Sequence, residues 1–297
     1  MAVEQNTITL QDRRLLGWAE YGDPAGSPVL YFHGGLSSRL DIRFADADCR
    51  RRGVRLLAID RPGIGLSTFQ PGRSLLDWPK DVSEFLDHLG LPAAAVMGWS
   101  GGGPYVMACA YAIPDRLTAA ATIAGMAPID GHGEVAELGL GADRLLFPLS
   151  RRAPTLAAIV LGLVARRSRA ATRRTFLSSL SSESDKSTVA AMSLADSTDF
   201  LFEAMRLGPA GTVHDYRIMG GAWGLDLAEV SFPVTVWQGD EDRLLPMAHA
   251  QRLSRGLQNG ALKVVAGRGH FLLHHELGRV LDGLEGAAAS TPTPLAS

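Results

Sequence analysis

One serine in a glycine-rich stretch is the residue of this chain best suited to covalent chemistry. The stretch GWSGG spans 98–102, directly after the apolar run AAVM and before a helical pattern. A sharp turn between a strand and a helix holds a serine in a strained backbone conformation that only small neighbours tolerate. Its hydroxyl then stands clear of the sheet at the N-terminus of the helix. The alternative is a loop that only connects the two elements, but this context favours Ser100 as a nucleophile.

A serine hydroxyl is a weak nucleophile until a base takes its proton. Of the eight histidines, His270 lies in GRGH (267–270), after the last expected strand and before a terminal helix. That loop opens at the carboxyl edge of the sheet, the same edge as Ser100, so His270 is the predicted base. His88 falls on an expected helix and is interpreted as a surface residue. His274 has metal-ligand spacing from His270, but no acidic ligand completes a zinc pattern such as H-E-x-x-H.

The acid that orients the base is expected after the strand VTVWQ (234–238), where three carboxylates stand in GDEDRLLP (239–246). A carboxylate in this role holds the imidazole tautomer and stabilises the imidazolium as it forms. We predict Asp242, in a G-x-x-D-x-x-x-P arrangement. Asp240 stays the alternative, although aspartate at that position suits the capping of a turn.

Two backbone N–H groups are candidates for holding a developing oxyanion. The segment His33-Gly34-Gly35 follows the apolar run VLYF (29–32), and a glycine-rich turn lets backbone approach a substrate closely. Gly35 can supply one donor, and Gly101, next after the nucleophile, the other. His33 itself is interpreted as a side chain that fixes the loop, with a catalytic role as the alternative.

Short apolar runs that alternate with longer helical patterns must position these residues. This alternation predicts an α/β fold, a mostly parallel doubly wound sheet with helices on both faces. A helix is expected over 76–89, because its apolar residues recur at helical spacing before Gly90 and Pro92. The expected strands are 8–10, 15–20, 29–32, 54–60, 94–98, 117–123, 234–238 and 262–265.

The alternation lapses between 126 and 225, a region rich in Arg, Ser, Ala and Leu and poor in strand formers. We interpret 126–225 as a helical cap inserted into a core made of 1–125 and 226–286. The alternative is a second independent domain, but the sheet pattern resumes at Val234. The Pro- and Ser-containing segment 287–297 is predicted to be a disordered tail.

Composition excludes several classes of partner. Among 297 residues, 29 basic and 31 acidic side chains leave a net charge of −2, which gives no reason to expect nucleic acid. Two cysteines, Cys49 and Cys109, favour a reducing cytoplasm over a disulfide framework. The N-terminus shows no secretory pattern, and the apolar run 156–165 is too short to span a membrane, so no stable insertion is expected.

Basic residues gather at both ends of that apolar run. In the cap they are interpreted as a solvated face, with transient attraction to anionic surfaces as the alternative. The residues concerned are Arg151, Arg152, Arg166, Arg167 and Arg169.

Taken together, the motifs resemble the α/β-hydrolase superfamily over nearly the whole chain. They are HGG (33–35), DRPGIGLS (60–67), GWSGG (98–102), AIPDRL (112–117), GDEDRLLP (239–246) and GRGH (267–270). The chain order Ser100, Asp242, His270 is the order of that fold. A dinucleotide-binding interpretation of 60–67 fails, because Thr68 stands where a third glycine is required.

The resemblance also separates this chain from some relatives. Epoxide hydrolases and haloalkane dehalogenases of this fold carry an aspartate where this chain has Ser100. The stretch HGGLSSR resembles the corresponding stretch of proline iminopeptidases. That family typically carries HGGPG, and here Leu36 replaces the proline.

The expected function is hydrolysis of a small to medium hydrophobic carboxylic ester through an acyl-serine, without metal or organic cofactor. Amide, thioester, lactone or carbon–carbon cleavage by the same triad stays open, because fold does not settle the bond. A ligand-binding, receptor-like member with little turnover is the alternative from another class. The substrate is expected to be a small molecule, and the oligomeric state is not indicated.

Overall fold

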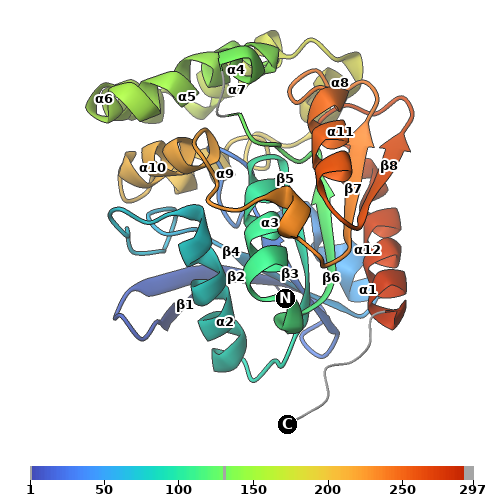
Figure 1. The fold of residues 1–297 in the computed structure, drawn as a ribbon. Coiled ribbons are helices and arrows are strands. Elements are labelled where there is room, and N and C mark those ends of the chain that lie inside the picture. The colour runs from blue at the N-terminus through green and yellow to red at the C-terminus, as the bar shows by residue number, and fades with distance from the viewer. Residues whose placement is uncertain (1, 130–131, 291–297) are drawn as a thin grey trace.

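A sheet of eight strands runs through the molecule in the order β1-β2-β4-β3-β5-β6-β7-β8 (Figure 1). The computed structural model describes residues 2–129 and 132–290. β2 pairs antiparallel with β1 and β4, and all pairs from β4 to β8 are parallel, which confirms the predicted fold class. The strands are β1 Val3–Thr9, β2 Leu15–Gly22, β3 Ser27–Phe32, β4 Val54–Ile59, β5 Ala94–Trp99, β6 Leu117–Ile123, β7 Val234–Gly239 and β8 Gly260–Val265.

The first strand differs most from its prediction. The sequence predicts a strand only at 8–10, whereas β1 occupies Val3–Thr9 and pairs with β2 along most of its length. β1 is an edge strand whose side chains are mostly exposed or half-buried, so much of it is polar. An edge strand of this kind lacks the continuous apolar run by which a buried strand is recognised.

The central strands show why the chemistry-bearing loops meet. β5 is buried along its whole length, as expected for a strand covered on both faces. Phe32 at the end of β3 pairs with Gly98 of β5, and Trp99 pairs with Ile123 at the end of β6. The segments that follow these strands therefore leave the sheet at one carboxyl edge.

Helices cover both faces of the sheet and divide its core in two. One apolar cluster includes side chains of α2, α3 and α11, and the other includes those of α1 and α12. The predicted helix at 76–89 is found as α2, preceded by a short 3-10 turn with a Ser74–Asp77 capping box. The helices are α1 Asp46–Arg51, α2 Trp78–His88, α3 Gly103–Ala112, α11 Met247–Gly256 and α12 Leu273–Ser290.

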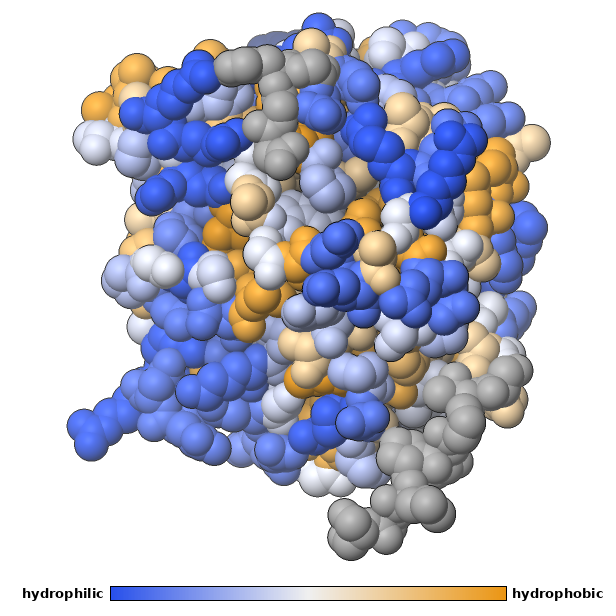
Figure 2. All heavy atoms as spheres, in the orientation of Figure 1, coloured by the Kyte–Doolittle hydropathy of each residue, from blue (hydrophilic) through white to orange (hydrophobic). Residues whose placement is uncertain are grey.

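Between β6 and β7 in the sequence, the described residues form seven helices. In Figure 1 these helices lie above the carboxyl edge of the sheet. Several of their buried side chains, such as Phe147 and Val213, belong to the same apolar cluster as α2 and α3, whereas Val189 of α8 belongs to the cluster of α1 and α12. In Figure 2 apolar atoms gather at the upper left, where Figure 1 places α6. The helices are α4 His132–Glu137, α5 Gly141–Arg152, α6 Pro154–Ala165, α7 Arg169–Ser179, α8 Glu183–Ala191, α9 Asp199–Ala204 and α10 Ala210–Met219.

The C-terminal segment is more ordered than its composition predicts. α12 continues to Ser290, so residues 287–290 of the expected tail are helical, whereas 291–297 lie outside the described residues. The three alanines at 287–289 favour continuation of a helix that packing has already started.

No helix in the described part of the chain combines the length and the apolarity needed to cross a bilayer.

Candidate active site

Ser100 sits at a turn with the backbone conformation that exposes a nucleophile. Its φ is +55°, in the left-handed region that a residue with a side chain rarely adopts. A 3-10 turn, Ser100–Gly102, leads directly from β5 into α3. A Cβ on Gly102 would collide with the carbonyl of Phe32, and one on Gly98 would crowd the carbonyl of Gly102. The glycines of GWSGG are therefore required by the close approach of neighbouring backbone.

His270 and Asp242 meet at the same edge. The Nδ1 of His270 lies 2.9 Å from Oδ2 of Asp242, and both side chains are buried. Gln238 donates its Nε2 to the same Oδ2 at 3.1 Å. The other oxygen, Oδ1, accepts the backbone N–H groups of Leu244 and Leu245, each at 2.9 Å. Asp242 is thus held from both sides with its oxygen directed at the imidazole.

The competing carboxylate Asp240 points elsewhere. Its Oδ1 accepts the N–H of Gly267 at 2.7 Å, which fastens the loop after β7 to the loop after β8. Trp99 adds a second connection, because its Nε1 donates to the carbonyl of His270 at 3.0 Å. The loop that carries the imidazole is thereby fixed to the strand that carries Ser100.

Several charges set the protonation of the imidazole. Burial acts to lower the pKa of His270, but three carboxylates, Asp242, Asp185 and Asp143, together raise it above its ordinary value. Asp242 has the strongest influence of the three and is the only one whose hydrogen bond to the ring contributes. A raised pKa makes His270 a stronger base, which suits proton abstraction from serine.

Gly35 and Gly101 lie side by side, as a two-donor oxyanion site requires. A Cβ built on Gly101 would be 2.7 Å from the backbone nitrogen of Gly35. A side chain on Gly101 would therefore crowd that nitrogen, whereas a Cβ on Gly35 would make only ordinary contacts. The loop after β3 therefore comes close to the turn that follows Ser100, and the role of the two N–H groups as oxyanion donors stays a prediction.

His33 is buried beneath this loop and does not reach the triad. Its Nδ1 lies 3.0 Å from the carbonyl of Gly34, and its Nε2 accepts the N–H of Arg61 at 3.4 Å. Burial, with the Arg61 charge beside it, holds the pKa of His33 well below its usual range. A neutral imidazole in these bonds fixes the loop, in line with the interpretation made from the sequence.

A buried ionic network, which the motifs did not reveal, supports the same loop. The guanidinium of Arg61 donates to the carbonyls of His33 and Gly34 at 2.6 and 2.8 Å, and to Asp215 of α10 at 2.7 Å. Asp215 also pairs with Arg73. Burial alone would raise the pKa of Asp215, but the two arginines hold it far below its usual range. The network joins a helix of the 126–225 region to the loop after β3.

A tyrosine–carboxyl pair borders the predicted oxyanion site. The hydroxyl of Tyr216 lies 3.5 Å from where a Cβ of Gly35 would stand, and it donates to Oδ1 of Asp143 at 2.8 Å. Burial raises the pKa of Asp143 to about 6, against the opposing effects of that bond and of His270. Burial also keeps the Tyr216 hydroxyl protonated by raising its pKa well above the ordinary value.

Asp185 of α8 is the second carboxylate beside the histidine loop. It is buried, and its Oδ1 accepts the backbone N–H of Phe271 at 2.9 Å. A Cβ on Gly269 would collide with this carboxylate, so GRGH needs its second glycine to admit Asp185. The Oδ2 atom has no hydrogen-bond partner among the described residues. Burial raises the pKa of Asp185, whereas His270 and the Phe271 N–H act to lower it.

Three of the other candidate histidines differ from His270 in their surroundings. His88 is exposed on α2, and His249 accepts the N–H of Ala127 at 3.2 Å. His274 stacks on Phe44 with ring centroids 3.7 Å apart, and burial lowers its pKa to about 4. Within 2–129 and 132–290, no group of three or more His, Cys, Asp or Glu side chains is arranged to hold a metal ion.

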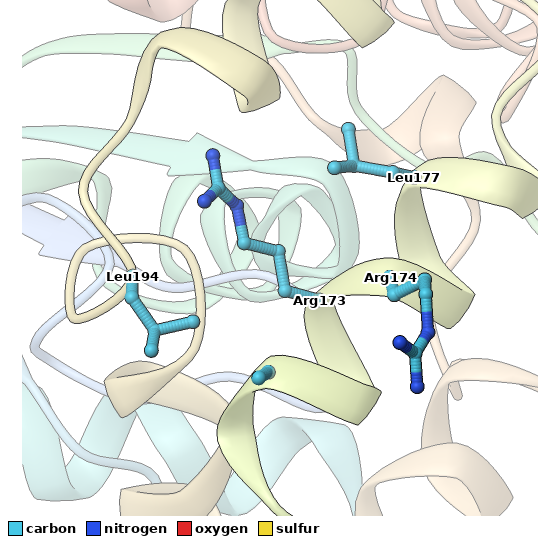
Figure 3. A pocket seen from close by; sticks show the side chains of 5 residues that line it. Arg173, Arg174, Leu177 and Leu194 are labelled. Atoms are coloured by element: carbon cyan, nitrogen blue, oxygen red, sulfur yellow. The ribbon is translucent and has the colours of Figure 1, made fainter.

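A hollow on the outer side of the 126–225 region is a separate feature (Figure 3). Arg173 at its floor donates to the carbonyls of Val189, Ala190 and Met192 at the end of α8. Because this guanidinium is committed to the helix terminus, it supports α8, which carries Asp185. The hollow is lined by Ala170, Arg173, Arg174, Leu177 and Leu194.

Comparison with known proteins gives one family for this arrangement. A family model described as alpha/beta hydrolase fold matches residues 27–277. Proline iminopeptidase from Arabidopsis thaliana is 28% identical over 117 residues, which cover 37% of this chain and 30% of that protein. A poly(3-hydroxyalkanoate) depolymerase from Ectopseudomonas oleovorans is 27% identical over 161 residues, covering 50% of this chain and 55% of its own length. The matched segments thus span about a third to a half of these relatives.

Solved structures resemble the whole chain more evenly. The esterase RhEst1 from Rhodococcus sp. ECU1013 superposes with a TM-score of 0.69 at 21% identity, covering 98% of this chain and 100% of its own. A thermophilic esterase from Thermogutta terrifontis gives a TM-score of 0.68 at 20% identity, with 96% and 97% covered. At these identities the likeness shows the fold.

Proposed function

This chain belongs to the alpha/beta hydrolase family, and on that premise we propose that it is a serine hydrolase of small to medium hydrophobic carboxylic esters. The observation that carries the proposal is the buried His270–Asp242 pair, 2.9 Å between Nδ1 and Oδ2, at the sheet edge where Ser100 holds its strained turn. Nucleophile, base and orienting acid in this arrangement are what acyl transfer needs.

The proposed reaction uses groups of this chain alone. Ser100 Oγ attacks the ester carbonyl while Nε2 of His270 takes the hydroxyl proton. Asp242 accepts the hydrogen bond from Nδ1–H, which holds this proton on the ring and stabilises the imidazolium. The N–H groups of Gly35 and Gly101 hold the oxyanion. His270 then protonates the leaving alcohol, which departs as the acyl-serine forms. Water, activated by the same imidazole, attacks the acyl group, and Ser100 recovers its proton as the acid is released.

The choice of a hydrophobic substrate rests on the side chains above the oxyanion site. Met219 of α10 approaches both glycines: a Cβ on Gly101 would be 2.8 Å from its sulfur. Tyr216 packs against Phe147 of α5 with ring centroids 4.7 Å apart. These three buried side chains form an apolar wall from two helices. We propose that 126–225 acts as a cap and that this wall binds the acyl or alkoxy group.

A second candidate function has one observation in its favour. Asp143 is half-buried beside Tyr216 and influences the pKa of His270, so a carboxylate of the cap faces the reaction centre. With its pKa near 6, Asp143 is mostly ionised above neutral pH and could pair with an ammonium group of a substrate. That would favour amide cleavage next to a free amine, as the name of the iminopeptidase relative suggests, although Leu36 replaces the proline typical of that group.

Covalent labelling tests the proposal most directly. A fluorophosphonate probe should modify Ser100, located by peptide mass mapping, and p-nitrophenyl esters of increasing chain length should be hydrolysed with an optimum that measures the pocket. We expect Ser100→Ala to lose the label and lower kcat by about 10⁴-fold or more. Ser179→Ala, a change at an exposed serine of α7, should match the unmodified protein.

Three other outcomes would redirect the proposal. Retained turnover in the folded Ser100→Ala variant would contradict the nucleophile assignment. Faster turnover of prolyl or alanyl anilides than of esters, abolished by Asp143→Asn, would favour the second candidate. Ligand-induced thermal stabilisation without label or turnover would favour a binding protein, the alternative that needs no chemistry.

A further inference from the structure

Helix α6 is apolar on every side, yet it lies at the surface. Its sequence PTLAAIVLGLVA contains no charged residue. A helix of this composition is expected in a protein core or against lipid. Only Ala157 and Leu161 are buried, whereas Leu156, Ile159 and Leu163 are 49%, 56% and 59% exposed. The burial available within this chain therefore covers one narrow face of the helix.

The exposed side chains form a stripe rather than a scatter. Leu156, Ile159 and Leu163 follow one another at spacings of three and four, which places them on one face of the helix. α5, which packs against α6, exposes Leu145 to 55%. Of the nine large aliphatic side chains exposed in the described part of the chain, four lie on these two helices. Figure 2 shows the resulting apolar area at the upper left, with hydrophilic atoms beside it.

The charge that flanks this stripe along the sequence has one sign. Residues 144–182 contain no aspartate, glutamate or lysine, so their formal charge is entirely positive although the whole chain carries −2. One exposed arginine pair ends α5, one residue before α6 begins, and another follows α6 directly. The eight arginines are Arg144, Arg151, Arg152, Arg166, Arg167, Arg169, Arg173 and Arg174.

From this combination we propose that the outer face of α6, with its flanking arginine pairs, docks on the surface of an anionic phospholipid bilayer. An apolar stripe takes a place among the acyl chains, and arginines beside it pair with phosphate-bearing headgroups. A helix of 12 residues is about 18 Å long, against roughly 30 Å of hydrocarbon, so it lies in the interface and does not cross it.

Charge also decides between this occupant and a second copy of the chain. Two copies joined through this face about a two-fold axis would place arginine-rich surfaces opposite each other. Like charges brought together in this way oppose association. An anionic bilayer surface instead attracts the arginines. The proposed docking does not rest on the proposed esterase activity.

Vesicle co-sedimentation of the full chain tests the docking. We expect the protein to pellet with phosphatidylcholine vesicles that contain phosphatidylglycerol, to pellet less at high salt, and to stay in solution with phosphatidylcholine alone. The triple variant Leu156→Gln/Ile159→Gln/Leu163→Gln should bind the anionic vesicles at least about tenfold more weakly. Arg166→Gln/Arg167→Gln should weaken binding by several-fold and reduce its salt dependence.

Matched controls separate this face from general surface effects. Val264→Thr changes an exposed aliphatic side chain of β8, and Arg255→Gln changes an exposed arginine of α11; both should bind as the unmodified protein does. Every variant changes only exposed side chains, so near-ultraviolet circular dichroism should show that each protein is folded. Absence of pelleting, equal pelleting with neutral vesicles, or loss by the controls would overturn the proposal. So would a dimer in sedimentation velocity that the triple variant abolishes.

Discussion

The carboxyl edge of the sheet and the outer layer of the 126–225 region differ in the side chains that they bury. The edge buries charged side chains, whereas the outer layer exposes apolar ones. At the edge, Arg61, Asp215 and Asp242 are almost fully buried, and each is held by several hydrogen bonds. On α6, aliphatic side chains face solvent between exposed arginines. Buried charges that are fully paired fix a geometry, because breaking one contact leaves an unpaired charge inside the protein. The edge therefore holds its side chains in fixed positions, whereas the outer layer leaves exposed the apolar side chains for which we propose a docking role.

The largest expected effect concerns the acid at the edge. Asp242→Asn removes the carboxylate that bonds His270 and should lower kcat by about 10³- to 10⁴-fold. Asp240→Asn removes only the bond to the Gly267 N–H and should change kcat by less than about threefold. Steady-state kinetics on one ester compares the two variants. A greater loss in Asp240→Asn would transfer the role to Asp240.

The next effect is on stability. Asp215→Asn leaves Arg61 and Arg73 buried without their counter-charge, so we expect the free energy of unfolding to fall by about 3–5 kcal/mol. Urea denaturation measures the change. Asp282→Asn, at a largely exposed carboxylate of α12, is the matched control and should stay within about 0.5 kcal/mol. A small loss in Asp215→Asn would show that the edge does not depend on this network.

A smaller effect should reach the sheet edge from the 126–225 region. The base is active only when His270 is neutral, so kcat/KM should fall as the pH drops through its raised pKa. Asp185→Asn removes one of the charges that raise it, so this acid limb should move to lower pH, with a loss at the plateau of less than about tenfold. Glu183→Gln, an exposed change in the same helix, should leave the profile unchanged. A lower plateau with no shift of the limb would indicate a packing role alone.

The smallest effect distinguishes the outer face of α6 from a structural core. Leu163→Gln should change the melting temperature only slightly, because the side chain is already 59% exposed. The free energy of unfolding should change by no more than about 0.5 kcal/mol. Leu161→Ala, on the buried face of the same helix, should cost about 2–5 kcal/mol. Thermal unfolding of the two variants makes the comparison. Equal costs would mean that α6 is covered on both sides in solution.

The family, the fold class and the candidate triad could be predicted from sequence because each depends on local backbone requirements. Close packing at GWSGG excludes side chains on Gly98 and Gly102, and GRGH must admit Asp185 beside Gly269. Such requirements leave glycines at fixed offsets from the reactive residue, and these offsets can be read without a structure. Continuous apolar runs likewise mark the strands that are buried on both faces.

Only the tertiary structure decided which other carboxylates lie around the candidate site. Asp143, Asp185 and Asp215 lie on separate helices with no motif around them, and their partners are 73, 86 and 154 residues away. A single aspartate on a helix carries no local signal, because its role depends on what the fold packs against it. The same holds for α6: the sequence shows an apolar run between arginine pairs, but packing decides which face of the helix stays exposed.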